Sequence, residues 1–253
     1  MTGTMQYLPP ATQQPQPQGG GSDWRTKYQG QVADNYDDKR AGQAKWTVEQ
    51  ALIEQMLSDL PPGSWVLDAP CGTGRFLEYC INHQLIYRGL DISEDMIAQA
   101  AAKIDNQCAV FTMKTPDGRE GQTPQVSFTK GDVLSSGIPD KAVDAALCIR
   151  ITRGLSPDEC QQMFREMQRI SRDRIILTAR VCNHQHARPL ALFEAVMSDE
   201  WELARSECGA SGPAEAPVED SAYRIFMFRR KQAVMSQPKS DDTWIMDPYE
   251  ATS

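Results

Sequence analysis

The sequence predicts an α/β protein built on a doubly wound, seven-stranded, mostly parallel sheet. Short apolar runs alternate with capped helical patterns, the first run breaks into a glycine turn, and carboxylates close three successive runs. Because right-handed crossovers place helices on both faces of a parallel sheet, this alternation indicates two covering layers of helices. The last two strand-like runs have no helix between them, which predicts a terminal hairpin with an antiparallel edge strand.

The first half of the chain predicts two βα units behind an N-terminal helix. After the segment 24–40, Thr47 and Gln50 fit a capping box, and the helix that they would open ends at Pro61. Ser93 is expected to cap a later helix, because its side-chain oxygen can accept a backbone N–H bond. The expected elements are a strand at 65–67, a helix to 83, a strand at 85–90 and a helix at 93–104.

An insertion then interrupts the alternation. Residues 105–124 contain turn signals at 115–118 and 120–121, and they predict an inserted hairpin or flap. Further on, Ser156 and Glu159 form a second capping box, with Pro157 at the first helical position. The expected elements are strands at 125–129, 143–151 and 174–181, helices at 156–170 and 189–198, and strands at 200–206 and 223–230.

Both ends of the chain differ in composition from the middle. Residues 1–22 are rich in Gln, Pro and Gly and predict a disordered N-terminal tail, because they hold too little apolar surface to fold. Residues 232–253 are mostly polar and are interpreted as a C-terminal tail, with docking through Trp244 and Tyr249 as the alternative. One domain is therefore expected over residues 23–231.

Composition limits where the protein acts and what it binds. The seven cysteines are odd in number and form no C-x-x-C pair, which indicates reduced thiols rather than disulfides or a metal site. No apolar run approaches the roughly 20 residues that cross a bilayer, and no signal peptide is evident, so a soluble, cytoplasmic protein is expected. The net charge of −8 disfavours a broad nucleic-acid surface. No pattern indicates an oligomeric state.

The glycine turn predicts a ligand site. Asp68 closes the first strand, and Gly72 and Gly74 follow it, so a ligand can lie close to bare backbone amides. A dinucleotide fingerprint requires a third glycine where Leu77 stands, and a pyrophosphate would be repelled by Asp68. The loop therefore favours a ligand with a cationic group over a dinucleotide.

Asp68 with the loop Cys71-Gly72-Thr73-Gly74 resembles the first motif of class I S-adenosylmethionine-dependent methyltransferases, and the resemblance extends over most of residues 24–231. It implies the Rossmann-like methyltransferase fold and S-adenosylmethionine as the cofactor. In that family the strand-end acid and the glycine loop hold the amino acid part of the cofactor. The resemblance also implies that residues after the next two strands bind the nucleoside.

Two further acids extend the resemblance. Asp91 closes the second strand, where a carboxylate can accept both hydroxyls of a ribose. Asp132 and Val133 resemble the adenine-binding pair, although a simple turn is the alternative for Asp132. The expected cofactor-binding residues are Asp68, Ala69, Cys71, Gly72, Gly74, Asp91, Ile92, Met96, Asp132 and Val133.

The acceptor is harder to infer, because the activated cofactor leaves little chemistry to the protein. Candidate acceptor-side residues are Tyr36 in the entry segment, Arg153 after the fourth strand and His184 after the fifth. Relatives often carry a histidine near the position of Arg153, so a histidine general base is doubtful here. A solvent-exposed loop position is the favoured interpretation of His184.

Three functions remain open at this point. The leading hypothesis is methylation of a small molecule, which the acidic surface favours. Lys39, Arg40 and Lys45 form a mixed basic rim that would suit RNA, DNA or protein as the acceptor, but Asp37 and Asp38 adjoin it. The third hypothesis is a catalytically inactive, cofactor-binding subunit of a partner, since a fold does not guarantee activity.

Overall fold

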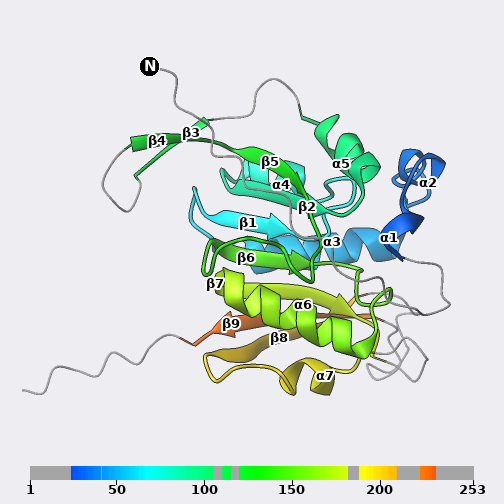
Figure 1. The fold of residues 1–253 in the computed structure, drawn as a ribbon, viewed down its shortest axis with the longest axis vertical. Coiled ribbons are helices and arrows are strands. Elements are labelled where there is room, and N and C mark those ends of the chain that lie inside the picture. The colour runs from blue at the N-terminus through cyan, green and yellow to red at the C-terminus, as the bar shows by residue number, and fades with distance from the viewer. Residues whose placement is uncertain are drawn as a thin grey trace, which may run out of the picture.

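The structure, a computed structural model, describes residues 24–40, 42–104, 110–114, 120–181, 188–209 and 223–231. These residues contain a seven-stranded sheet in the order β5-β2-β1-β6-β7-β9-β8 (Figure 1). The strands are β1 (Trp65–Asp68), β2 (Ile86–Asp91), β5 (Val126–Lys130), β6 (Val143–Cys148), β7 (Ser171–Ala179), β8 (Trp201–Gly209) and β9 (Tyr223–Arg230).

The sheet is parallel from β5 to β7, and β9 pairs in the antiparallel sense with both β7 and β8. The predicted doubly wound sheet of seven strands is therefore confirmed, together with antiparallel pairing at one edge. Within that edge, β9 is the reversed strand and β8 lies outermost. The N- and C-terminal tails expected at 1–22 and 232–253 lie outside the described residues.

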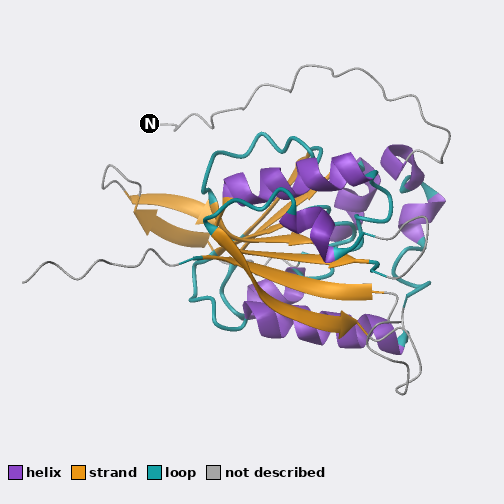
Figure 2. Ribbon diagram, turned by 90° about the horizontal axis from the view of Figure 1, so that it is seen from below, coloured by secondary structure: helices purple, strands orange, loops and turns teal. Residues whose placement is uncertain are grey.

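Helices lie on both faces of the sheet, as Figure 2 shows. They are α1 (Trp24–Lys27), α2 (Gln31–Asp34), α3 (Ala44–Leu57), α4 (Leu77–Asn82), α5 (Glu94–Ala101), α6 (Pro157–Ile170) and α7 (Leu190–Glu194). Because successive strand residues point to opposite faces, Leu67 joins a core cluster with Phe164 of α6, and Val66 joins another with Ile53 of α3. None of the described helices has the length and apolar character of a membrane span.

Two of the three predicted helix caps are confirmed. Ser93 accepts a hydrogen bond from Met96 N–H at the start of α5, and Ser156 and Glu159 form the reciprocal capping box of α6. The capping box predicted at Thr47 and Gln50 is wrong. Helix α3 begins three residues earlier, at Ala44, so Thr47 is an interior helical residue.

The insertion forms an antiparallel hairpin of β3 (Val110–Lys114) and β4 (Glu120–Pro124), which confirms the hairpin prediction. Its second strand uses residues that the sequence assigned to a turn, because the strand-like piece after it belongs to β5 of the main sheet. In Figure 1 the hairpin extends away from the other helices and strands.

Alanine substitution should have different effects at Ser156, which caps α6, and at Thr47, which lies inside α3. Ser156→Ala removes one half of a capping box and should lower the free energy of unfolding by about 1 kcal/mol. Thr47→Ala is the matched control, because it replaces an exposed residue inside α3 and should be neutral or stabilising by a few tenths of a kcal/mol. Urea unfolding of both variants measures the difference. Equal destabilisation by the two substitutions would contradict the assigned start of α3.

Candidate functional site

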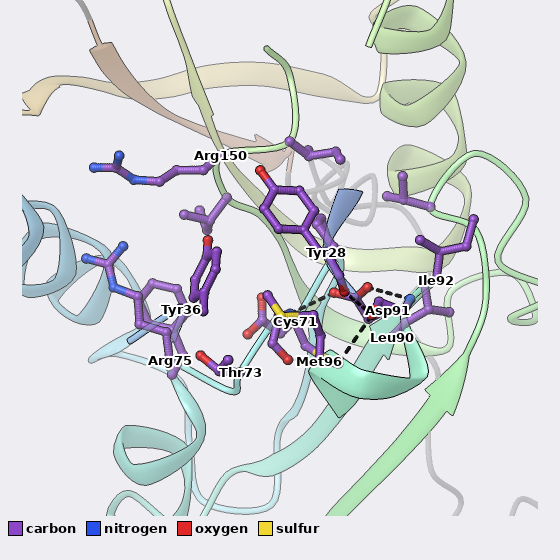
Figure 3. Close-up of a pocket in the computed structure, with 18 of the residues that line it drawn as sticks. Tyr28, Tyr36, Cys71, Thr73, Arg75, Leu90, Asp91, Ile92, Met96 and Arg150 are labelled. Carbon is purple, nitrogen blue, oxygen red and sulfur yellow. Dashed lines mark hydrogen bonds between the residues drawn. The ribbon is translucent and has the colours of Figure 1, made fainter. Parts of the chain in front are cut away.

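A pocket lies at the carboxyl ends of the central strands, next to the point between β1 and β6 where the strand order reverses. Open parallel sheets bind their ligands at this point. The empty space of the pocket is about 850 Å³ when its open mouth is included. Figure 3 shows its labelled lining, which includes Tyr28, Tyr36, Asp91 and Arg150.

Asp91 joins two loops of the pocket. Its Oδ2 accepts a hydrogen bond from Gly72 N–H at 2.8 Å, and its Oδ1 accepts one from Ser93 N–H at 2.9 Å. The glycine loop after β1 is thereby held against the start of α5. A carboxylate oxygen has more than one lone pair, so both oxygens can also accept bonds from a ligand.

Asp68 is buried at the end of β1 and also lines the pocket. Its Oδ2 accepts a hydrogen bond from the Tyr87 hydroxyl at 2.8 Å. Burial, with a contribution from the negative charge of Asp91, raises the pKa of Asp68 to about 7. Burial also raises the pKa of Asp91. An ionised Asp68 is therefore costly unless a positive charge lies against it.

The two glycines of the loop have different positions: Gly72 faces the pocket, and Gly74 faces α5. Gly72 lines the pocket at φ +53°, whereas Gly74, at φ +72°, packs against α5, where an added Cβ would lie 3.1 Å from Cβ of Ala100. Cys71 lines the pocket but is 4 % exposed, and burial raises the pKa of its thiol. Cys71 therefore remains a protonated packing residue, and Gly72 is the residue of this loop that lines the pocket with bare backbone.

An apolar wall faces the acids. Ile92, Met96 and Val133 line the pocket, as the sequence predicts. Asp132 and Ala69 are not part of the lining: the Asp132 carboxylate accepts a hydrogen bond from Leu134 N–H, and Ala69 is buried in the core. The structure thus brings most of the predicted cofactor residues to one pocket and gives Ala69, Gly74 and Asp132 other contacts.

The N-terminal segment covers the pocket. Tyr28 and Tyr36, which meet edge to face at 5.8 Å between ring centroids, both line it. Five contacts among the described residues fasten this segment to the glycine loop, to α5 and to the residues that flank α5. Four run from Gly30 N–H to Asp95 at 2.7 Å, Thr73 Oγ1 to Asp37 at 2.6 Å, Gln99 to Asp34 at 3.0 Å and Lys103 to Asp37 at 2.6 Å, and in the fifth the Ser93 hydroxyl donates to the Tyr28 carbonyl.

A buried ion-pair network, which the sequence analysis missed, forms another wall. Glu49 of α3 is 1 % exposed, and it binds Arg75 at 2.7 Å and Arg150 at 2.9 and 2.7 Å. Arg75 also stacks on Trp46, with Cζ 3.7 Å from the ring centroid. One sequence signal was available: Glu49 lies four residues before the buried Ile53, so a carboxylate occupies the apolar face of a helix.

Of the three acceptor-side candidates, one lines the pocket, one lies outside it and one is outside the described residues. Tyr36 lines the pocket, and burial raises the pKa of its hydroxyl, so it is a hydrogen-bond donor rather than a base near neutral pH. Arg153 is exposed and is not part of the lining. His184 lies outside the described residues. Among the residues that the structure describes, no three His, Cys, Asp or Glu side chains gather as a metal site.

The donor set fits S-adenosylmethionine. Two buried acids in one pocket call for a ligand that brings positive charge, and the cofactor carries an ammonium and a sulfonium group. The free lone pairs of Asp91 suit vicinal hydroxyls, and the wall of Ile92, Met96 and Val133 suits a purine. These residues therefore have the chemistry to hold such a nucleoside.

The unusual pKa of Asp68 predicts a pH-dependent stability. Folding raises the pKa of Asp68 from 3.8 to about 7. The protonated Asp68 therefore contributes its full stabilisation at a pH below its unfolded-state pKa of 3.8, and this contribution is lost as the pH rises to about 7. Relative to Asp68→Asn, the ligand-free wild type should lose up to about 1.4 kcal/mol per pH unit across this window. Urea titrations of both proteins measure the difference, and a pH-independent difference would contradict the assignment.

Known proteins support the same interpretation. Residues 66–174 match the family described as a methyltransferase domain. No curated protein matches the chain. A solved structure of magnesium protoporphyrin IX methyltransferase from Synechocystis, with bound S-adenosylmethionine, is similar in fold at a TM-score of 0.56 and 20 % identity, over 83 % of this chain and 90 % of that one.

Two other solved structures share the fold. A TehB-like S-adenosylmethionine-dependent methyltransferase from Corynebacterium glutamicum has a TM-score of 0.54 at 19 % identity, over 79 % of this chain and 98 % of that one. The [4+2]-cyclase SpnF has a TM-score of 0.53 at 19 % identity, over 75 % and 83 %. Because one of these proteins is named a cyclase, the fold alone does not fix the reaction.

The family match supplies what the fold does not. It spans the strand-end acids Asp68 and Asp91 and the glycine loop between them, which together form the floor of the pocket. The match therefore shows a methyltransferase domain over residues 66–174, and the seven-stranded sheet in the order β5-β2-β1-β6-β7-β9-β8 is the fold of the solved S-adenosylmethionine-dependent methyltransferases.

Proposed function

We propose that this methyltransferase acts on a small-molecule acceptor bound beneath residues 24–40. The observation that carries the proposal is the attachment of this segment to the glycine loop and to α5. The bond from Thr73 Oγ1 to Asp37, at 2.6 Å, fastens the cover to the same loop that forms the floor. A covered pocket has room for a small ligand, whereas a polymer needs an open groove.

Charge around the cover agrees with this proposal. The rim that would suit RNA, DNA or protein consists of Lys39, Arg40 and Lys45, and Arg40 is already engaged. Its guanidinium stacks on Tyr36, with Cζ 3.4 Å from the ring centroid, and donates to the Tyr36 carbonyl at 2.8 Å. Two lysines on a chain of net charge −8 give a weak surface for a polyanion.

The cofactor would be held by residues from three strand ends. Asp68 and the Gly72 backbone would hold its amino acid part, and Asp91 its ribose. Ile92 and Met96 would pack on the purine. We also retain Asp132 and Val133 as the adenine pair, although Asp132 would have to reach the ring while its carboxylate caps its own turn.

Bound S-adenosylmethionine supplies an activated methyl group, so this chain needs mainly to bind, orient and exclude water. Tyr28 and Tyr36 exclude water by covering the pocket. The Tyr36 hydroxyl remains protonated and can donate a hydrogen bond to an acceptor. Proximity and alignment then contribute most of the acceleration, without a general base from Arg153 or His184.

Removing the Asp91 carboxylate tests the cofactor site. Asp91→Ala should weaken S-adenosylmethionine binding by about 1 to 3 kcal/mol, because it removes a charged hydrogen-bond partner and releases the Gly72 loop. Asp144→Ala is the matched control: it removes the same charge at the other end of the sheet, where Asp144 binds Trp65 N–H. Calorimetry measures both dissociation constants, and an unchanged value for Asp91→Ala would mean that the ribose lies elsewhere.

Methyl transfer to a small molecule is tested with the full-length protein. Incubation with methyl-labelled S-adenosylmethionine and a metabolite extract should place label in the low-mass fraction, and Asp91→Ala should reduce that signal. Persistent label in RNA, DNA or protein alone would reject the proposal in favour of a macromolecular acceptor.

A further inference from the structure

The backbone of Arg150 has a conformation that residues other than glycine rarely adopt. Arg150 follows β6 at φ +60°, a left-handed region that costs a non-glycine residue about 1 to 2 kcal/mol. Its backbone N–H donates to Thr178 Oγ1 at 2.7 Å, and its guanidinium binds both oxygens of Glu49. Such conformations persist only where surrounding contacts impose them, and they concentrate at functional sites. These contacts fix Arg150 in the pocket wall.

The wall carries more positive than negative charge. Within the described part of the chain, Glu49 is the single acid that forms a salt bridge with Arg75 and with Arg150. The Trp46 ring lies 3.7, 5.0 and 5.6 Å from Cζ of Arg75, Arg150 and Arg40. Figure 3 shows Arg75 and Arg150 on the side of the pocket opposite Asp91 and Ile92. The pocket is therefore acidic at the end expected to bind the nucleoside and basic at the other.

Arg180 is not part of the pocket lining, but it shares a neighbour, the Tyr223 ring, with Arg150 at this basic end. Arg180 follows β7, and Arg150 follows the neighbouring strand β6. Cζ of Arg180 lies 5.6 Å from the ring centroid of Tyr223, and Cζ of Arg150 lies 5.3 Å from it. The Nε atom of Arg180 is buried and has no hydrogen-bond partner among the described residues. A buried, unsatisfied donor on a charged group is costly, and an oxyanion would satisfy it.

We propose that Arg150 and Arg180 form a subsite, beside Tyr223, for an oxyanion of the acceptor, either a carboxylate or a phosphate. This inference rests on the proposed function, because it assigns the acceptor of the same pocket to the class of small organic anions. The planar guanidinium of Arg180 suits both groups, since two parallel N–H bonds can meet two oxygens. Nε and Nη2 of Arg150 already bind Glu49, so Arg150 would contribute its Nη1 and its positive charge. Glu49 positions Arg150 and partly offsets its charge, so the subsite retains a net attraction for an anion.

The cofactor also carries a carboxylate, so the test must separate the two sources. The metabolite extract is divided on an anion exchanger before incubation with labelled S-adenosylmethionine and the full-length protein. Label arising from the retained fraction supports the anionic subsite, and label arising only from the unretained fraction overturns it. Phosphatase treatment of the retained fraction then distinguishes a phosphate from a carboxylate. Label in neither fraction would instead contradict small-molecule methylation itself.

Variants of the retained-fraction reaction test Arg180 directly. Arg180→Met should raise KM for the active fraction by about tenfold or more with little change in kcat, as expected for a lost charged hydrogen bond. Arg180→Lys keeps the charge and should recover part of the loss. Arg172→Met, at the opposite end of β7 and paired with Asp144, is the matched control and should leave KM unchanged.

Binding of the demethylated cofactor decides the remaining alternative. S-adenosylhomocysteine retains the carboxylate, and its dissociation constant should be the same within about twofold for wild type and Arg180→Met. A tenfold weaker constant for the variant would assign Arg180 to the cofactor and overturn the acceptor subsite. An unchanged KM for Arg180→Met would overturn it as well.

Discussion

The site depends on one carboxylate that joins two loops. Asp91 accepts a backbone N–H from Gly72, after β1, and another from Ser93, at the start of α5. These bonds fix the glycine loop against the helix on which the N-terminal cover also rests, through Asp95. Floor, wall and cover are therefore aligned by contacts that meet at the end of β2. Loss of this acid would leave the sheet intact and release the glycine loop from the start of α5.

Charge divides the pocket into two ends. Asp68 and Asp91 are buried at one end, where burial raises the pKa of each, and this cost is relieved by a cationic ligand. At the other end, Glu49 binds Arg75 and Arg150, and Arg180 lies close by. A cationic cofactor and an anionic acceptor would thus enter opposite ends of one cavity. This separation orients both molecules before any bond is broken.

Much of the fold and part of the site could be predicted from local patterns. Apolar runs, the Ser93 cap and the Ser156 capping box each act over a few residues, and the acids at Asp68 and Asp91 follow directly from strand ends. Long-range contacts were missed. Glu49 meets Arg150 across 101 positions, and the same helix starts at Ala44 despite the local capping pattern at Thr47. The close approach of Gly74 to Ala100 is another contact that local sequence does not show.

Acids at adjacent strand ends should bind a cationic nucleoside and not a dinucleotide. Calorimetric titration of the full-length protein with S-adenosylmethionine and, in parallel, with NAD tests it most directly. Saturable binding of S-adenosylmethionine at one site per chain, with no measurable uptake of NAD, is the result that this account predicts. Failure of the folded protein to bind S-adenosylmethionine, or a preference for NAD, would contradict it.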